Sequence, residues 1–435
     1  MRILTFLLVT TAFFAISAQA QTIQMPSEIV EGNQVPLRVE GLAPGEKITL
    51  HLRRVTEEGR IATSSTVLDV GDDGILDPAD DVAVSGAYLG VDSAGPFWSM
   101  RPEGLTDADR GTLKVAVRRG DILLAERTVR LLAMSPQISV EEIPEFVGAR
   151  LYRPRGDRVL PLIVVLGGSE GGSSFGRSFA PRLAELGYAA LALPYHNPQW
   201  TGESLPGLPQ AFADIPVDRL VTVREWTKGR SDLSADQMAI YGVSKGGEFA
   251  MLAAARFPWL RAVIGIVPSD VVWEGWGADG PEGTRSSFAW QGVPLDFVPY
   301  FGMGEAIEAL GRGEARSLAV PHLEGRRRNS DRAASARIRV ERYEGPMLIA
   351  GGDRDTTWPS GEMVRAMAER RAEASLPTVA MTFADAGHGL AGTGWVPLNY
   401  ARADTSVAAN AAAQIVIWER TVRFLREHLG ERAEP

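Results

Sequence analysis

The stretch Gly242-Val243-Ser244-Lys245-Gly246-Gly247-Glu248 decides the fold. It contains the pattern G-x-S-x-G, which is typical of a sharp turn from a strand into a helix, with glycines on both sides of the serine to relieve crowding. Residues 238–241 are predicted to form the strand, and residues 246–256 the helix. The sequence therefore predicts that the Ser244 hydroxyl stands above a sheet edge as a nucleophile, the alternative being a structural turn serine.

Apolar, strand-like segments alternate with helix-like segments on both sides of this turn. Continuous apolar runs favour strands that are covered on both faces, and an alternation of strands and helices favours a parallel, doubly wound sheet. With the serine turn, this predicts an α/β fold of the α/β-hydrolase type, a catalytic domain over residues 137–435. The strands are expected at 162–166, 188–193, 238–241, 262–267, 346–350 and 378–383, and the helices at about 179–186, 217–227, 246–256 and 408–428.

Residues 21–136 follow another rhythm. Apolar and polar residues alternate with period two in short segments, and turns rich in glycine and aspartate, such as residues 71–74, separate them. This pattern predicts an N-terminal immunoglobulin-like β-sandwich domain. Its clearest strands are expected at 34–39, 47–52, 112–117 and 128–132.

One interval interrupts the alternation in the second domain. Residues 270–337 separate two predicted sheet strands by far more than an ordinary crossover, and they are rich in aromatic residues. An insertion at the strand ends predicts a lid over an active site. Trp273 and Trp276 are candidates for contact with an apolar substrate group, although such rings also pack lid cores.

The first 20 residues have the features of a signal peptide. Arg2 precedes an apolar run of roughly 14 residues, which is short for a membrane span of about 20, and Ala18-Gln19-Ala20 is a small-x-small cleavage site. We expect cleavage before Gln21, export to a bacterial periplasm, and no integral membrane span in the mature chain. An uncleaved anchor is the alternative.

Composition excludes several classes of function. The 435-residue chain carries 45 basic and 54 acidic residues, a net charge of −9, whereas a nucleic-acid partner requires a strongly basic face. It contains no cysteine, which excludes disulfides, thiolate metal sites and a cysteine nucleophile. The histidines lack metal-ligand spacing and no dinucleotide fingerprint occurs, so neither a metal nor another cofactor is expected.

A serine hydroxyl needs a base, and the chain offers five histidines. In α/β-hydrolases the triad follows the order serine, acid, histidine, and the histidine lies in the loop after the last strand. His388 has that place in Asp385-Ala386-Gly387-His388-Gly389, and it is the predicted base. His196 precedes the serine and is a candidate for lining the pocket. The remaining histidines are His51, His322 and His428.

The acid is expected after the strand at 346–350, in Gly352-Asp353-Arg354-Asp355-Thr356-Thr357-Trp358-Pro359. Asp355 is the first choice by its spacing from the strand, and Asp353 is the alternative. The acid holds the imidazole in the correct tautomer and stabilises the imidazolium. The other aspartate is expected to support the loop or to pair with Arg354.

An oxyanion hole needs two aimed N–H donors. The backbone N–H of Lys245, the residue after the nucleophile, is one candidate. The second is expected from the glycine-rich loop Gly167-Gly168-Ser169-Glu170-Gly171-Gly172, with Ser169 as the first candidate and Glu170 the next. A phosphate-binding loop is a weak alternative because no G-K-[ST] follows.

These motifs together resemble the acyl-CoA thioesterase and bile acid-CoA:amino acid N-acyltransferase (BAAT) family over nearly the whole mature chain. The elbow Ser244-Lys245-Gly246-Gly247-Glu248 is more specific than G-x-S-x-G, and the spacing from Asp355 to Trp358 matches the family's D-x-x-W. The family often has an acidic residue just before that aspartate, where this chain has Arg354. The other matching segments are 35–45, 74–77, 90–92, 97–100, 167–172, 355–360 and 386–388.

The resemblance implies cleavage of an acyl thioester through an acyl-enzyme. Members with a cysteine nucleophile favour transfer to an amino acid and those with serine favour hydrolysis, so Ser244 points to a small-molecule acyl thioester or ester as substrate and to water as acceptor. Transfer to an amine or alcohol is the alternative, and a catalytically silent binding protein is a third hypothesis. Acyl-CoA is cytoplasmic, however, so an exported member is expected to act on other esters, thioesters or amides. The run Arg326-Arg327-Arg328 either meets a phosphate-bearing substrate or forms a solvated lid surface.

Overall fold

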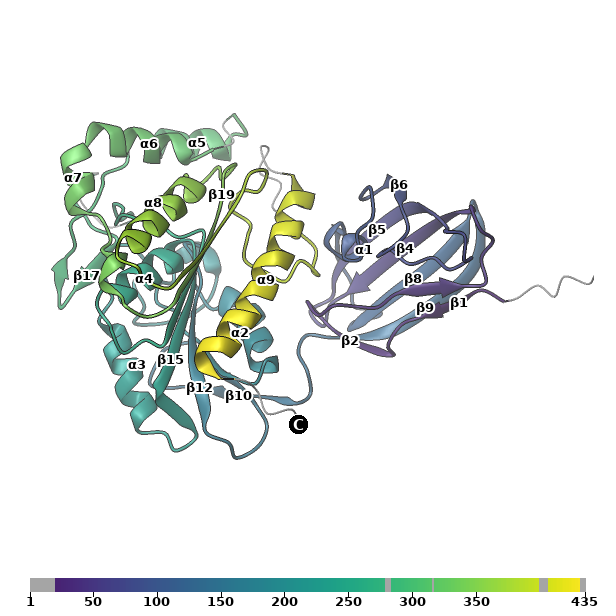
Figure 1. Ribbon diagram of the computed structural model, residues 1–435, viewed down its shortest axis with the longest axis horizontal. Coiled ribbons are helices and arrows are strands. Elements are labelled where there is room, and N and C mark those ends of the chain that lie inside the picture. The colour runs from purple at the N-terminus through teal and green to yellow at the C-terminus, as the bar shows by residue number, and fades with distance from the viewer. Residues whose placement is uncertain (1–19, 278–282, 315–316, 399–405, 431–435) are drawn as a thin grey trace, which may run out of the picture.

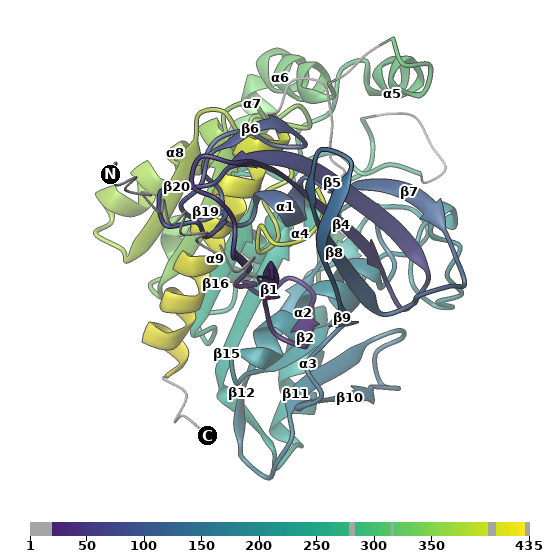
Figure 2. The same ribbon diagram turned by 90° about the vertical axis from the view of Figure 1, so that its right-hand side faces the viewer.

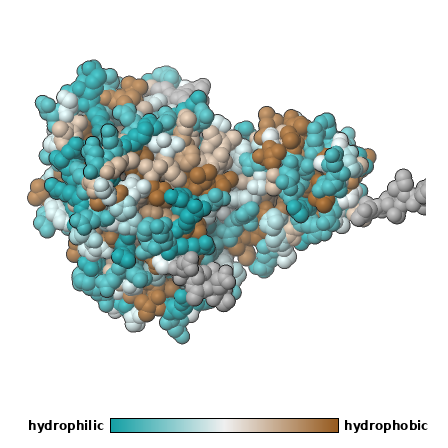
Figure 3. All heavy atoms as spheres, in the orientation of Figure 1, coloured by the Kyte–Doolittle hydropathy of each residue, from teal (hydrophilic) through white to brown (hydrophobic). Residues whose placement is uncertain are grey.

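The computed structural model describes residues 20–277, 283–314, 317–398 and 406–430, and within them two domains lie side by side (Figure 1). Figure 3 shows these domains as a larger and a smaller lobe that meet at a narrower waist. Residues 1–19 of the predicted signal peptide lie outside the described residues. None of the helices in the described ranges combines the length and apolarity that a bilayer crossing requires.

The first domain is built on a sheet with the strand order β2-β9-β8-β4-β5-β6, in which β7 also pairs with β5. Neighbouring strands are antiparallel except β2 and β9, which are parallel. The strands are β2 (Glu28–Val30), β4 (Lys47–Val55), β5 (Arg60–Asp69), β6 (Ala83–Gly86), β7 (Arg101–Leu105), β8 (Thr112–Arg119) and β9 (Ile122–Leu132).

A smaller layer packs against this sheet. It contains the antiparallel ribbon of β1 (Thr22–Gln24) and β3 (Arg38–Glu40), together with loops and the short helix α1 (Gly95–Trp98). Inward side chains of both layers share one core, with Leu50, Val115 and Val39 at most 1% exposed. The β-rich N-terminal domain is therefore confirmed, as one large sheet with a ribbon and loops as its second layer.

The second domain is built on a sheet with the order β10-β11-β13-β12-β15-β16-β19-β20. All strands from β13 to β20 in this order are parallel, and β10 and β11 extend the sheet in antiparallel fashion. The strands are β10 (Ile138–Glu142), β11 (Arg150–Pro154), β12 (Leu160–Leu166), β13 (Ala189–Ala192), β15 (Leu233–Val243), β16 (Ala262–Ile266), β19 (Met347–Gly352) and β20 (Thr378–Phe383).

Helices cover both faces of this sheet because its strands are apolar on both sides. In β12, Leu162 and Val164 belong to one core, whereas Ile163 and Val165 belong to the core on the opposite face. The first core includes side chains of α3 (Arg219–Lys228), α4 (Lys245–Ala254) and α8 (Ser360–Glu373), and the second those of α2 (Ser174–Glu185) and α9 (Val407–Leu429). The predicted α/β fold with a mostly parallel sheet is confirmed.

Residues 270–337, hereafter the insertion, lie between β16 and β19. Its β17 (Phe288–Trp290) pairs with β18 (Val293–Pro294) and with β14 (Ile215–Pro216), and its helices gather at one end of the second domain (Figures 1 and 2). The helices are α5 (Met303–Gly311), α6 (Ala319–Arg328) and α7 (Ser330–Ser335); the 3₁₀ turns η1 (Gln199–Thr201) and η2 (Val340–Arg342) lie outside the insertion.

Specific contacts join the domains. Arg182 of α2 is buried and donates hydrogen bonds to the carbonyl oxygens of Glu31 and Ala133. Further along the interface, the ring centroids of Phe97 and Trp395 are 5.4 Å apart, and Leu398 N–H donates to the Trp98 carbonyl at 3.1 Å. The segment after His388 is therefore fixed against the first domain.

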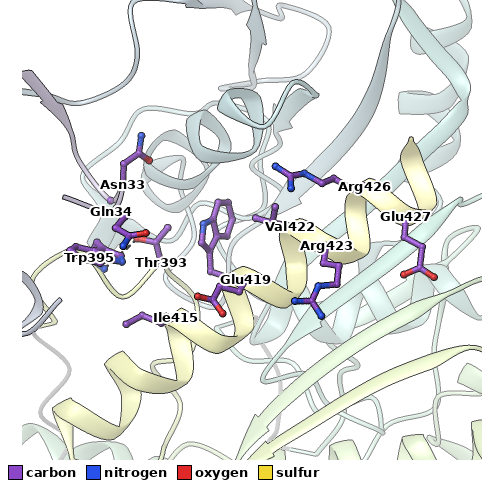
Figure 4. Close-up of a pocket in the computed structure, with 12 residues that line it drawn as sticks. Asn33, Gln34, Thr393, Trp395, Ile415, Glu419, Val422, Arg423, Arg426 and Glu427 are labelled. Carbon is purple, nitrogen blue, oxygen red and sulfur yellow. Dashed lines mark hydrogen bonds between the residues drawn. The ribbon is translucent and has the colours of Figure 1, made fainter. Parts of the chain in front are cut away.

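A cleft of about 890 Å³ opens along α9 at the domain boundary (Figure 4). Its lining includes Asn33 and Gln34 from the first domain, and Arg423 and Arg426 from α9. Ser244, Asp355 and His388 do not line it. The cleft is thus separate from the site described next.

Candidate active site

Ser244 occupies a strained turn between β15 and α4. Its φ of +55° and ψ of −118° lie outside the ordinary regions for a residue with a side chain, a conformation that costs about 1–3 kcal/mol. The turn also brings backbones very close together. A Cβ on Gly242 would lie 2.0 Å from the Gly246 carbonyl oxygen, and one on Gly246 would lie 2.2 Å from that of Gly167. The glycines are therefore required, as the motif predicted.

The structure brings Ser244, His388 and Asp355 together. His388 Nε2 lies 2.9 Å from Ser244 Oγ, and His388 Nδ1 lies 2.7 Å from Asp355 Oδ2. In the resting arrangement Nδ1–H donates to the carboxylate and Nε2 accepts the serine proton. These residues come from the ends of β15, β19 and β20, which meet at one edge of the sheet.

Of the two candidate acids, Asp355 is the one that contacts the histidine. Its side chain is fully buried, and its Oδ1 accepts the backbone N–H groups of Thr357 at 2.8 Å and Trp358 at 3.3 Å. Asp353 instead pairs with Arg365 at 2.8 Å. The expected pairing with Arg354 does not form, since Arg354 pairs with Asp385 at 3.1 Å.

The loop that carries His388 is held by buried polar residues of α9. Asn410 accepts the Gly387 N–H at 2.8 Å, and Gln414 donates to the Gly389 carbonyl at 2.9 Å. The Trp358 ring packs edge-on against the imidazole with centroids 5.5 Å apart. These contacts fix the loop on both sides of the base, and sequence reasoning had not identified either α9 residue.

The loop after β12 passes directly beside the nucleophile. A Cβ on Gly168 would lie 2.9 Å from Ser244 Cβ and 3.4 Å from Ser244 Oγ. Ser169, the predicted donor, follows in the same loop. Lys245 is the first residue of α4, whose first-turn N–H groups have no partner within the helix. Lys245 thus directly follows the serine, Gly168 of the second loop lies beside it, and the role of Lys245 and Ser169 as oxyanion donors stays a prediction.

The side chain of Glu170 enters the same site. Its Oε1 accepts the Gly168 N–H at 2.8 Å, so the carboxyl group folds back over its own loop. The residue remains exposed, but partial loss of water around the carboxyl group raises its pKa, an effect that backbone N–H groups and His388 oppose. The sequence had suggested only a backbone donor here.

The Lys245 side chain takes part in a buried ion pair. Its Nζ lies 2.6 Å from Glu248 Oε2 and 2.8 Å from the Ser287 hydroxyl, and Glu248 Oε1 accepts the Trp273 N–H at 3.0 Å. Burial lowers the pKa of Lys245 and raises that of Glu248, while their mutual attraction opposes both shifts. Because Trp273 and Ser287 belong to the insertion, this pair connects the nucleophile helix to it.

The other predicted contact residues pack within the protein. Trp273 is fully buried, with its ring stacked on Tyr300 at 5.7 Å between centroids, and Trp276 stacks on Phe212 at 4.5 Å. His196 is 1% exposed and hydrogen-bonds the Gln210 carbonyl through Nε2. Burial lowers its pKa to about 4, so it is neutral near pH 7. A substrate-binding role for these residues stays a prediction.

The remaining candidate groups have local partners. His322 of α6 is buried against the rings of Trp273 and Trp358, and burial lowers its pKa to about 4. Arg326 makes a two-pronged pair with Asp270 at 2.9 and 2.6 Å, and Arg327 and Arg328 both pair with Glu324. All three arginines of α6 therefore have carboxylate partners: Arg326 joins the helix to Asp270, and Arg327 and Arg328 pair with Glu324 of the same helix.

Within the described ranges, no cluster of three or more histidine, aspartate or glutamate side chains is arranged to hold a metal ion. The geometry that is present suits nucleophilic catalysis. A serine at a helix N-terminus, an imidazole that can take its proton and a buried carboxylate that orients the imidazole can form and hydrolyse an acyl-enzyme.

Two models of known families match this chain. Residues 32–145 match the family model for the acyl-CoA thioester hydrolase/BAAT N-terminal region, and residues 225–431 match that for the BAAT/acyl-CoA thioester hydrolase C-terminal region. The second match includes all three residues of the candidate triad.

Similar proteins of known function include both thioesterases and transferases. Mouse bile acid-CoA:amino acid N-acyltransferase is 22% identical over 94% of this chain and 98% of its own length. Rat acyl-coenzyme A thioesterase 1 is 26% identical over 52% of this chain and 55% of its own length. Among solved structures, a puromycin-hydrolyzing peptidase of Mycobacterium tuberculosis aligns with a TM-score of 0.44 and 14% identity over 90% of this chain and 54% of that chain. By both family matches, the chain belongs to the acyl-CoA thioester hydrolase/BAAT family.

Proposed function

We propose that this protein is a serine hydrolase that cleaves acyl thioesters, or related esters, through an acyl-enzyme on Ser244. The observation that carries the proposal is the continuous hydrogen-bonded chain from Ser244 Oγ to His388 and on to Asp355. Family membership supports the thioester class, because both matching models are named for acyl-CoA thioester hydrolases together with BAAT.

In the proposed reaction, His388 Nε2 takes the proton of Ser244 as Oγ attacks the acyl carbonyl. The backbone N–H of Lys245 and an N–H of the loop after β12 stabilise the oxyanion. His388 then gives its proton to the leaving thiol or alcohol. Water, activated by the same imidazole, hydrolyses the acyl-enzyme. The insertion is proposed to act as a lid, since its residues Trp273 and Ser287 bind the ion pair beside the nucleophile.

The test is a hydrolysis panel of acyl-CoAs and p-nitrophenyl esters of varied acyl length. Ser244→Ala should lower turnover by about 10³-fold or more, because the nucleophile is lost while the fold is kept. Ser335→Ala is the matched control, because Ser335 is exposed on α7. Equal turnover by the wild type and the Ser244→Ala variant would reject the proposal.

Acyl transfer is the second candidate function. Relatives that match over nearly the full length include N-acyltransferases, such as rat acyl-coenzyme A amino acid N-acyltransferase 2, which is 23% identical over 94% of this chain. A transferase forms the same acyl-enzyme but passes the acyl group to an amine. Adding glycine or taurine to the reaction distinguishes the two, because a transferase yields the acyl amide whereas a hydrolase yields the free acid.

The proposal includes export. Arg2, the apolar run after it and Ala18-Gln19-Ala20 support a signal peptide that is removed before Gln21. A periplasmic enzyme meets little acyl-CoA, so esters, thioesters or amides with other leaving groups belong in the substrate panel. N-terminal sequencing of the protein from its native cell tests this part, and a chain still starting at Met1 would contradict it.

A further inference from the structure

Glu170 is an ionisable group of the site that the proposed mechanism leaves unused. Its carboxyl group folds back over the loop after β12, where Oε1 accepts the Gly168 N–H at 2.8 Å. No side chain among the described residues donates a hydrogen bond to this carboxyl group or pairs with it as an ion. A carboxylate can accept several hydrogen bonds, so this one keeps acceptor capacity for a bound molecule.

The Glu170 carboxyl oxygen that does not bind Gly168 N–H lies near the nucleophile. The position that a Cβ on Gly168 would fill lies 2.8 Å from Glu170 Oε2 and 3.4 Å from Ser244 Oγ. The carboxyl oxygen and the attacking oxygen therefore both lie close to the Gly168 backbone. When Ser244 attacks a carbonyl carbon, a group one or two bonds away from that carbon comes within reach of Glu170.

The negative charge of Glu170 should favour cationic substrate groups over anionic ones at this position. A carboxylate at close range attracts an ammonium or N–H donor and repels another carboxylate, and a charge-assisted hydrogen bond is roughly twice as strong as a neutral one. We infer that Glu170 is a specificity-determining residue that selects substrates carrying an amine next to the reacting carbonyl. The inference rests on the proposed function, because it concerns the acyl group that Ser244 attacks.

The ionisable groups around Glu170 support this assignment. Tyr195 and His196 follow β13, Glu203 lies beside Gly172, and His388 comes from the loop after β20. Burial keeps His196 neutral near pH 7 and Tyr195 protonated, so neither neutralises the carboxylate. Because the pKa of Glu170 is raised, its preference for a cationic group should fade as the pH falls through that raised pKa.

The experiment compares three p-nitrophenyl esters of similar size: the glycinate, the propionate and the monomalonate, which place a cation, a methyl group and an anion at the same position. Rates are measured below the usual pKa of an α-amino group, about 8, and corrected for spontaneous hydrolysis. The wild type should favour the glycinate over the propionate, and the monomalonate should be the poorest substrate.

Glu170→Gln should lower the glycinate-to-propionate ratio of kcat/KM by about tenfold or more, which corresponds to about 1.4 kcal/mol. It should raise the relative rate of the monomalonate. Glu170→Asp should retain part of the preference. Glu203→Gln is the matched control, because it removes a charge from the neighbouring segment where Glu203 already binds Ser173, and the ratio should stay unchanged.

Two results would overturn the inference while leaving the proposed function intact. One is an unchanged ratio in Glu170→Gln, and the other is an equal loss with all three esters, which indicates a structural role. If the wild type hydrolysed none of the esters and none of the acyl-CoAs in the panel, the proposed function itself would fail, and the inference with it.

Discussion

At the scale of residues, two aspartates that are two positions apart have opposite surroundings. Asp355 is fully buried, with one oxygen bound by backbone N–H groups and the other by His388. Asp353 is partly exposed and pairs with Arg365 on α8. Only the first can hold the imidazole, because only its carboxylate reaches Nδ1.

Asp355→Asn should lower kcat by about 10⁴-fold, since an amide no longer fixes the tautomer that accepts the serine proton. Asp353→Asn should change kcat by less than about threefold, because an exposed ion pair is worth little. Steady-state kinetics on the best ester of the panel measures both variants. A larger loss of kcat in Asp353→Asn than in Asp355→Asn would show that Asp355 is not the catalytic acid.

Sequence reasoning reached Ser244 and His388 because each has a fixed place relative to a strand end. It chose Asp355 by its spacing from the strand and kept Asp353 as the alternative, since excluding Asp353 needs the direction of a side chain in a loop. It named Glu170 only as a candidate backbone donor, and it had no signal for the Glu170 side chain, Asn410 or Gln414, because a polar residue in a loop or helix looks the same whether it faces solvent or the site.

At the scale of elements, α4 and the insertion are tied together by one buried charge pair. Lys245 and Glu248 are three positions apart, which places them on one face of α4, and their side chains are 2% and 0% exposed. Ser287 and the Trp273 N–H complete the hydrogen bonds of both ions. The helix that follows the nucleophile is thus held against the segment that is proposed to cover it.

Lys245→Met should cost about 3–5 kcal/mol of unfolding free energy, because it leaves Glu248 buried without its partner. The double variant Lys245→Met/Glu248→Met should recover most of that loss. Urea denaturation of both variants and of Glu248→Met completes a double-mutant cycle. Additive losses would show that the two charges are not coupled.

Regular elements of the second domain were predictable because their apolar patterns are long and continuous. The strands at 262–266 and 378–383 begin at the predicted residues, and α9 begins within one residue of the prediction. The short pairing of β14 with β17 was not predictable. It joins segments that are distant in sequence through a contact of a few residues, and such contacts depend on tertiary packing.

At the scale of the whole molecule, Arg182 is a buried contact between the two domains. Its guanidinium is buried, which lowers its pKa, yet it binds two carbonyl oxygens on the first-domain side and pairs with Glu185. A buried group of this kind is costly unless every donor is used. Arg182 is therefore a specific contact of this interface, beside those of Trp395 and Leu398 with the first domain.

Arg182→Met should destabilise the protein by about 1–3 kcal/mol, because the carbonyls of Glu31 and Ala133 lose their donor. The two domains should then unfold in more separated thermal transitions, which calorimetry measures. Arg177→Met, on the exposed side of α2, is the control and should leave the transitions unchanged. A single transition at the wild-type temperature in Arg182→Met would contradict this account.

The contact of Trp395 and Leu398 with the first domain has a consequence for the chemistry. Only a few residues separate His388 from a segment that Phe97 and Trp98 hold in place. The N-terminal domain therefore helps to hold the segment that follows the general base. A second domain expressed alone would keep its serine and the contacts of Asn410 and Gln414 with the His388 loop, but the segment that follows this loop would lose its contacts with Phe97 and Trp98.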